Sequence, residues 1–396
     1  MNILTFGPID QRAYEQLVRC GEAGDAAYAV LCGDHHVGNS QPIGGAIAYK
    51  DFISPSGVGY DIGCGNKAVR TNLLATHIKP KRVMDEIYSR ISFGVGRIND
   101  EPVDHPVLDK VAHAEFRPQR QLLDKAAAQL GTVGSGNHYV DLFSDEEGHL
   151  WIGVHFGSRG FGHATASGFL AMAQNLAFEE RAKEGEMDSP PVLFHTSSYL
   201  GQAYIEAMRL AGEYAYAGRD LVVDKVLEIL GARAVEEVHN HHNFAWQEEH
   251  HGEQCWVIRK GCTPAFPGQK GFVGATMRDK SVILEGVDGD LSKQALYSTV
   301  HGAGRVMSRT QAAGKLKKVD GKRVRVGGAV DWDAVQREMS EARIELRGSG
   351  ADEAPQVYKR LADVLAAHEG TVRVLHELAP IGVAMAGADV YDPYKD

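Results

Sequence analysis

Residues 57–65 read Gly-Val-Gly-Tyr-Asp-Ile-Gly-Cys-Gly, so the thiol of Cys64 follows the carboxylate of Asp61 by three positions. Glycine weakens the interior of strands and helices, and this density of glycine predicts a loop whose backbone can approach a ligand closely. Taken alone, a cysteine is usually a small buried apolar residue, and an aspartate often caps a turn. The chemistry of this stretch therefore depends on what the rest of the chain brings to it.

Three histidine motifs follow downstream, namely Asn137-His138, Val154-His155-Phe156-Gly157-Ser158-Arg159 and His242-Asn243-Phe244. A thiolate keeps several lone pairs and can bridge two divalent ions, and carboxylate oxygen and neutral imidazole nitrogen are their common partners. Two ions about 3.5–4 Å apart can clamp a phosphoryl group and neutralise the charge that builds on its oxygens. Together with Asp61 and Cys64, the motifs predict a two-metal site that shares a sulfur.

The third motif lies in a histidine-rich segment, residues 239–251, which holds too many imidazoles for one site. His239 and His242 would share a face if the segment were helical, and so would His242 and Trp246. Spacing alone leaves the choice of ligand open, and surface positions are expected for the other histidines.

A fourth motif, Val300-His301-Gly302-Ala303-Gly304-Arg305, has a different composition. The two glycines expose backbone N–H groups that can hold phosphate oxygens, and the arginine adds a planar fork of donors. A neutral imidazole in this setting can attack phosphorus and form a phosphoramidate. The motif favours phosphoryl or nucleotidyl transfer, although a histidine followed by glycine is common in loops.

The composition fits a cytoplasmic protein. No signal peptide or membrane-spanning apolar run is readable in the 396 residues, and the five cysteines contain no CxxC pair, which fits a reducing compartment. The net charge of −10 argues against electrostatic coating of generic nucleic acid. The densest basic run, residues 315–325, is interpreted as a solvated hairpin around Asp320-Gly321.

Strand-like and helix-like patterns alternate along the chain, so we expect a mixed α/β fold. Strands are predicted at 27–32, 43–49, 67–73, 151–156, 255–259 and 281–285. Helices are predicted at 80–91, 119–130, 163–184, 200–230 and 354–368, and from Asp331 toward Met339. Because the candidate ligands span residues 61–301 and must meet, we expect one domain, residues 1–396, with a polar metal-binding cleft.

These motifs resemble the RtcB family of GTP-dependent RNA-splicing ligases over nearly the whole chain, from Gly33-Asp34-His35-His36-Val37-Gly38 to Leu378-Ala379-Pro380. The stretches that carry the resemblance are Asp61-Ile62-Gly63-Cys64-Gly65, Gly134-Ser135-Gly136-Asn137-His138, Gly157-Ser158-Arg159-Gly160, Arg259-Lys260-Gly261, His301-Gly302-Ala303-Gly304-Arg305 and Glu353-Ala354-Pro355-Gln356-Val357-Tyr358-Lys359. The implied fold is a compact α/β domain.

The resemblance implies a cofactor set of GTP and two Mn²⁺ ions, with Cys64 bridging the metals. The ions would be completed by two pairs, Asp61 with His138 and His155 with His242; His242 is selected because the family's ligand stands directly before asparagine. His301 would be guanylylated by GTP. The implied reaction joins an RNA 3′-phosphate or 2′,3′-cyclic phosphate to a 5′-hydroxyl, in tRNA splicing or RNA repair.

The resemblance also implies a guanylate pocket, in which Tyr358 would stack on the base. Its residues would be Asn137, Asp141, Asn243, Gly274, Ala275, Thr276, Met277, Ser281, Gly302, Ala303, Gly304 and Tyr358. Three departures from the family pattern touch this pocket. Asp141 stands where the family has glutamate, residues 274–278 replace Pro-Gly-Ser-Met-Gly, and Met385-Ala386 lies where the family has a C-terminal Lys-Gly.

Two other function classes fit part of the pattern. A metal-dependent phosphatase or nuclease could use the same two ions with water as nucleophile, but it would not need the His301 motif. A non-catalytic paralogue that binds RNA ends would explain the missing lysine, but not the complete donor set. The sequence does not show which RNA is joined or whether an activator protein is required.

Overall fold

An eight-stranded sheet forms the centre of the computed structural model, which describes residues 1–183, 187–319, 322–388 and 390. Its order is β13-β14-β19-β6-β7-β5-β9, with β18 paired to β19 in parallel and the other pairs antiparallel. The strands are β5 (Gly65–Leu74), β6 (Tyr139–Ser144), β7 (His149–Phe156), β9 (Ala234–His241), β13 (Lys270–Val273), β14 (Ser281–Gly286), β18 (Glu345–Ser349) and β19 (Val372–Gly387).

A second, five-stranded sheet has the order β1-β2-β3-β11-β10. Its strands are β1 (Asn2–Thr5), β2 (Tyr28–His36), β3 (Ile43–Tyr49), β10 (Asn243–His250) and β11 (Glu253–Lys260). Three short pairs complete the β-structure: β4 (Phe52–Ile53) with β8 (Phe194–His195), β12 (Cys262–Pro264) with β15 (Ser298–Val300), and β16 (Lys315–Val319) with β17 (Lys322–Val326). His242 is the single residue between β9 and β10, so it joins the two large sheets.

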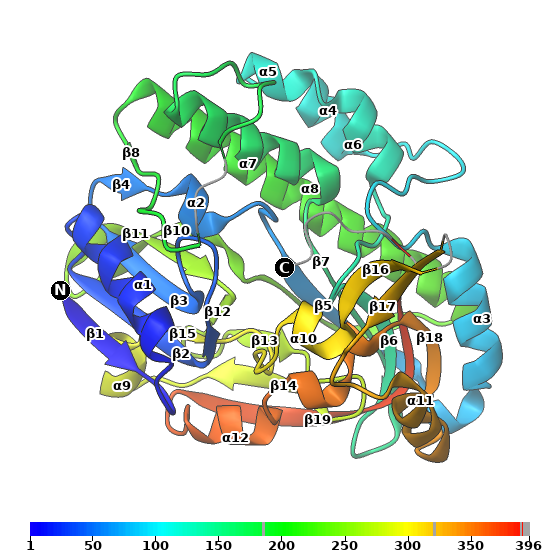
Figure 1. Cartoon of the computed structure of the whole chain (residues 1–396). Coiled ribbons are helices and arrows are strands. Elements are labelled where there is room, and N and C mark those ends of the chain that lie inside the picture. Colours follow the sequence, from blue (N-terminus) through cyan, green and yellow to red (C-terminus); the bar gives the residue numbers. More distant parts are fainter. Residues whose placement is uncertain (184–186, 320–321, 389, 391–396) are drawn as a thin grey trace.

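Two long helices, α7 (Arg159–Ala173) and α8 (Tyr199–Leu230), lie along one side of the molecule in Figure 1. α8 begins where the Ser198 hydroxyl accepts a hydrogen bond from the Gly201 amide, and it ends at Gly231, whose φ of 61° is left-handed. Its valines pack with those of β5, β6 and β7 in one apolar cluster, so α8 is fixed against the sheet that carries the histidine motifs.

The remaining helices are α1 (Gln11–Ala23), α2 (Pro55–Val58), α3 (Pro80–Arg90), α4 (Pro106–Ala112), α5 (Arg117–Arg120), α6 (Leu123–Gln129), α9 (Asp290–Gln294), α10 (Arg309–Ala313), α11 (Trp332–Glu341) and α12 (Leu361–Ala366), with 3-10 turns at η1 (Ala75–His77), η2 (Ala351–Glu353) and η3 (Pro355–Val357). Among them, α1 and α3 pack on the sheets, whereas α4, α5 and α6 pack on one another and on the outer side of α7 and α8. Among the described residues, no helix combines the length and apolar composition needed to cross a membrane.

The mixed α/β class and all six predicted strands are confirmed, as are the helices at 80–91 and 200–230 and the one from Asp331. Three helix predictions were too long. The 119–130 segment is divided between α5 and α6, and α7 ends at Ala173 because Asn175 has a φ of 61°. In 354–368 only α12 is α-helical, since Tyr358 is extended and bridges to Arg305. Glu184 and the turn at Asp320-Gly321 lie outside the described residues.

Candidate metal centre and nucleophile

Cys64 lies in the loop that enters β5, and its side chain is 5% exposed. Its amide donates to the Asp61 carbonyl at 3.0 Å, which closes a turn and brings the carboxylate back toward the thiol. Its own carbonyl accepts from the His242 amide at 2.8 Å and the Asn243 amide at 3.2 Å. Backbone hydrogen bonds therefore tie the glycine-rich loop to the segment that carries the third histidine motif.

Asp61, Cys64 and His138 form the first donor group, whose ligand atoms all lie within 4.8 Å of one another. His138 Nε2 is 3.1 Å from Asp61 Oδ2 and 3.7 Å from Cys64 Sγ. The ring fits there because residue 134 is glycine: a Cβ at that position would lie 2.0 Å from His138 Nδ1. One oxygen, one sulfur and one nitrogen donor thus converge from two segments far apart in the sequence.

Cys64, His155 and His242 form the second group, within the same 4.8 Å limit. Nδ2 of the Asn66 side chain donates to the Phe272 carbonyl at 2.8 Å, which leaves Oδ1 of the same side chain 2.6 Å from His155 Nδ1. That oxygen can only accept, so Nδ1 carries the hydrogen and the lone pair of Nε2 faces Cys64 Sγ at 3.8 Å. The two groups share Cys64.

The electrostatics of these residues suit divalent cations. Burial, followed by the charge of Asp61, raises the pKa of the Cys64 thiol, so a cation would be needed to stabilise the thiolate. Burial, and then neighbouring imidazoles, lowers the pKa of His155 and His242, which keeps both rings neutral. In the described structure, Nδ1 of His138 and of His242 are buried without a hydrogen-bond partner. The donor set fits two metal ions that share a sulfur.

His301 lies beside the second donor group, with its ring centroid 4.8 Å from that of His242. Asp34, a fully buried residue of β2, accepts three hydrogen bonds at Oδ2: from His301 Nδ1 at 2.7 Å, the His301 amide at 3.0 Å and the Gly302 amide at 3.3 Å. Nδ1 is therefore the protonated nitrogen, and Nε2 keeps its lone pair. Burial acts to raise the pKa of Asp34, but His301 lowers it below its ordinary value.

A comparison with known families agrees with this geometry. A family model described as "tRNA-splicing ligase RtcB" matches residues 23–117 and 109–386. The chain belongs to the RtcB family. The RNA-splicing ligase RtcB of Escherichia coli (strain K12) is 30% identical over 404 residues, covering 94% of each chain. The tRNA-splicing ligase RtcB of Thermococcus kodakarensis is 30% identical, covering 90% of this chain and 87% of its own.

Two residues of this RtcB-family site were missed by the sequence reasoning. Asp34 was quoted within a family stretch, but no role was given to a carboxylate 267 positions before His301. Arg219 of α8 is fully buried, and its Nη1 donates to the Gly63 carbonyl at 2.9 Å and the Phe156 carbonyl at 2.6 Å. Each of these carbonyls is next to a candidate ligand, so Arg219 holds the two ligand-bearing segments together.

Arg219 also accounts for two histidines that are not donors. Its Nε donates to His239 Nε2 at 2.8 Å, and its Nη2 lies 3.0 Å from His241 Nδ1. The segment is a β-strand, so these two side chains share the face opposite to Asn240 and lie against α8. His250 pairs with Glu248 at 2.7 Å. The helical spacing considered for this segment does not apply.

The candidate guanylate pocket of this RtcB-family chain is brought together only in part. Gly274 and Gly302 are close, since a Cβ on Gly302 would lie 3.5 Å from the Gly274 carbonyl. The Ala275 amide donates to Ser281 Oγ at 3.0 Å, which orders the loop after β13, and the Asn243 Oδ1 accepts from the Gly261 amide at 2.7 Å.

The other candidate pocket residues differ in burial. Met277 is buried in an apolar cluster with Met339, Val383 and Met385. Asp141 is buried on β6, with Oδ1 unpaired among the described residues, and burial raises the pKa of its carboxyl. Asn137 is exposed, Thr276 bonds to its own loop at Asp279, and Gly304 has a φ of 76° beside the Asp34 carbonyl. Ala303 is buried, and Tyr358 accepts from Arg305 at 3.0 Å.

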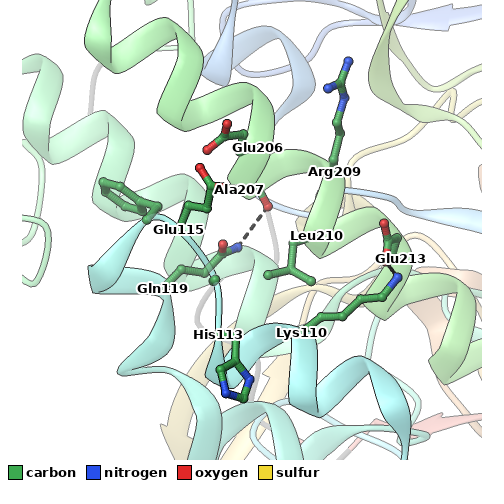
Figure 2. Close-up of a pocket in the computed structure, with 11 residues that line it drawn as sticks. Lys110, His113, Glu115, Gln119, Glu206, Ala207, Arg209, Leu210 and Glu213 are labelled. Atoms are coloured by element: carbon green, nitrogen blue, oxygen red, sulfur yellow. Dashed lines mark hydrogen bonds and ion pairs between the residues drawn. The ribbon is translucent and has the colours of Figure 1, made fainter.

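A separate cavity of about 520 Å³ lies between α4, α5 and α8 (Figure 2). Basic and acidic side chains both line its wall, and Lys110 and Glu213 form an ion pair there at 2.5 Å. Gln119 donates to the Ala207 carbonyl at 2.9 Å. None of the candidate metal, nucleophile or nucleotide residues lines this cavity, so its size does not mark the reactive site.

Proposed function

We propose that this protein is a GTP-dependent RNA ligase that joins 3′-phosphate or 2′,3′-cyclic phosphate ends to 5′-hydroxyl ends. The observation that carries the proposal is the position of His301, whose protonated Nδ1 is held by Asp34 beside a donor set suited to two metals. Membership in a family of RNA-splicing ligases supports RNA as the substrate. The phosphatase or nuclease alternative would leave this oriented imidazole without a role.

His301 Nε2 would attack the α-phosphorus of GTP, forming a P–N bond as pyrophosphate leaves. Water would first open a 2′,3′-cyclic phosphate to a 3′-phosphate. An oxygen of the RNA 3′-phosphate would then attack the same phosphorus, which breaks the P–N bond, releases His301 and joins the RNA 3′-phosphate to GMP through a phosphoanhydride. The 5′-hydroxyl would finally displace GMP and form the phosphodiester. Asp34 would balance the positive charge that develops on the ring in the first step and orient Nε2 throughout.

Asp61, Cys64, His138, His155 and His242 would hold the metal ions, which we propose to be Mn²⁺. Bound ions would neutralise charge on phosphate oxygens. Thiolate and imidazole donors alone favour Zn²⁺, because Mn²⁺ is the weakest binder of the divalent series. We propose that Zn²⁺ occupies the same site and inhibits. The five cysteines are unpaired and buried, which supports a reducing compartment such as the cytoplasm.

The test is to incubate the protein with GTP, Mn²⁺ and two RNA strands, one ending in a 3′-phosphate and the other beginning with a 5′-hydroxyl. A joined product that requires both GTP and Mn²⁺ is expected. Removal of the 3′-phosphate without joining would indicate the phosphatase alternative. Binding of both strands with no chemical change under these conditions would indicate the non-catalytic paralogue.

A further inference from the structure

The β16–β17 hairpin concentrates positive charge on a chain whose net charge is −10. The strand sequences Lys-Leu-Lys-Lys-Val and Lys-Arg-Val-Arg-Val contain basic residues and no acidic ones. Excess positive charge in a small area repels itself and attracts a polyanion. The strands of the hairpin therefore carry a charge opposite in sign to the net charge of the chain. They contain none of the candidate metal ligands and do not include His301.

The strand register distributes this charge over both faces of the hairpin. Lys315 pairs with Val326, and Leu316 pairs with Arg325. Because neighbouring residues alternate between faces, each face carries basic positions. The side chains of Lys315, Lys317 and Arg325 are exposed, and so are the intervening Leu316 (47%) and Val326 (44%). Lys315 and Lys317 have no carboxylate partner within the described part of the chain.

The root of the hairpin is attached to the site. The Ala329 amide donates to the Gln311 carbonyl at 2.9 Å and the Val330 amide to the Ala312 carbonyl at 3.1 Å, so the segment after β17 is bonded to α10. Arg309, the first residue of α10, lies against the loop that carries His138: a Cβ on Gly136 would be 3.0 Å from its Nη2. Figure 1 shows the hairpin extending from α10 as two adjacent arrows.

We infer that the β16–β17 hairpin is an RNA-docking arm that binds the sugar-phosphate backbone of the strand whose end reacts at the metal centre. The inference rests on the proposed function, since that function supplies a polyanion at the root of the hairpin. Exposed lysines and arginine on both faces suit phosphates, and the exposed Leu316 and Val326 can contact sugars or bases. Binding through phosphates would be independent of sequence and sensitive to salt.

The test compares two triple variants that each remove three positive charges: K315Q/K317Q/R325Q in the hairpin, and K50Q/K293Q/R373Q as control. The control positions are on the β3–β4 turn, α9 and the start of β19, which Figure 1 shows away from the hairpin. Binding of a fluorescent single-stranded RNA with a 3′-phosphate is measured by anisotropy at several salt concentrations. Thermal melting of each variant shows whether it folds.

The hairpin variant is expected to bind about ten- to a hundredfold more weakly, with its salt slope reduced by about 2, while the control stays within about twofold of wild type. Arg325 also donates to the Gly314 carbonyl at 3.2 Å, so its replacement removes a structural hydrogen bond as well as a charge. The double variant K315Q/K317Q keeps this bond, and its loss of RNA affinity should be intermediate. Equal losses of RNA affinity in the hairpin and control variants, or unchanged RNA affinity in both hairpin variants, would overturn the inference. The hairpin would then be a solvated surface element or a docking site for another class of partner.

Failure of this inference is distinguishable from failure of the proposed function. If wild-type protein binds RNA through the hairpin but never joins RNA ends, the ligase assignment fails and the docking arm stands. If wild-type protein joins RNA ends and hairpin substitutions change neither the dissociation constant nor the salt slope, the docking arm fails and the ligase assignment stands.

Discussion

At the residue scale, the candidate chemistry depends on the fact that Cys64 belongs to both donor groups. Asp61 and His138 approach the sulfur from one group, and His155 and His242 from the other. Compact local motifs predicted Asp61, Cys64, His138 and His155, whereas the choice of His242 within its histidine-rich segment came from the resemblance to the RtcB family. The sequence could not predict Asp34 or Arg219 as supports, since their roles arise from contacts between segments that only the folded chain brings together.

Replacing Cys64 by Ala is expected to abolish binding of both metal ions, because each donor group loses its sulfur. Metal content after dialysis against Mn²⁺, measured by mass spectrometry, should fall from two equivalents to nearly none. Cys255→Ala, at a buried thiol on β11 outside the donor groups, is the matched control and should keep both ions. Two equivalents in the Cys64→Ala protein would exclude the shared-sulfur arrangement.

Because Asp141 stands where the family has glutamate, we expect this protein to discriminate only weakly between GTP and ATP. The Asp141 carboxylate is about 1.5 Å shorter in reach than a glutamate, and Met385 cannot donate a hydrogen bond. Loss of one charge-assisted hydrogen bond, about 1.5–3 kcal/mol, corresponds to about ten- to a hundredfold in selectivity. Protein labelling by GTP and by ATP is compared in wild type and Asp141→Glu, and the variant should prefer GTP more strongly. A strong GTP preference in wild type, unchanged in the variant, would refute the prediction.

At the scale of elements, the second sheet is stabilised by a buried ion pair between β10 and β11. Arg259, from a family stretch, places Nη1 2.6 Å and Nη2 2.9 Å from the two oxygens of Glu248, and its Nε donates to Ser298 Oγ at 2.8 Å. This network connects β11 to β15, which leads directly into His301. The family stretch around Arg259 thus has a structural role that its letters alone did not reveal.

Glu248→Gln is expected to lower the free energy of unfolding by about 3–5 kcal/mol near pH 7, because Arg259 would be left buried without its counter-charge. Burial acts to raise the pKa of Glu248, but Arg259, together with hydrogen bonds from His250 and Arg259, lowers it below its ordinary value. The carboxylate therefore contributes stability above its unfolded pKa of about 4.3, and this contribution is lost as pH falls through the lower folded value.

Urea unfolding at pH 7 and in acid measures this effect, with the exposed Glu249→Gln on the same strand as control. The difference between wild type and Glu248→Gln should narrow as the pH falls below about 4.3. A constant difference across that range would show that the lost stability does not come from the ionised carboxylate.

The strand pattern was predictable because buried β-branched runs are local, whereas helix ends were less so. α7 ends at Ala173 although a helical pattern continues, and Tyr358 is extended where a helix was expected. The end of α7 is set locally by the left-handed backbone of Asn175, whereas the extended conformation of Tyr358 accompanies a bridge to the distant Arg305. The placement of Met277 and Met385 in one apolar cluster was equally unreadable, because they are far apart in sequence.

At the scale of the whole molecule, the two large sheets meet at the candidate metal centre. Cys64 directly precedes β5 of the eight-stranded sheet, and His301 directly follows β15. His242 connects the eight-stranded sheet to the five-stranded one. We propose that residues 1–396 act as one domain, since the candidate ligands come from elements that span the chain. The alternation of strands and helices predicted the class, but the sequence could not predict that one histidine would join the sheets.

The most direct test of the central claim is the covalent intermediate on His301. Wild-type protein and His301→Ala are incubated with α-labelled GTP and Mn²⁺, and the label and metal content are measured on both. Wild type should carry an acid-labile, alkali-stable label that maps to His301, as expected of a phosphoramidate, and the variant should carry none while keeping both metal ions. Label on the His301→Ala protein, or a wild-type adduct on another residue, would contradict the account.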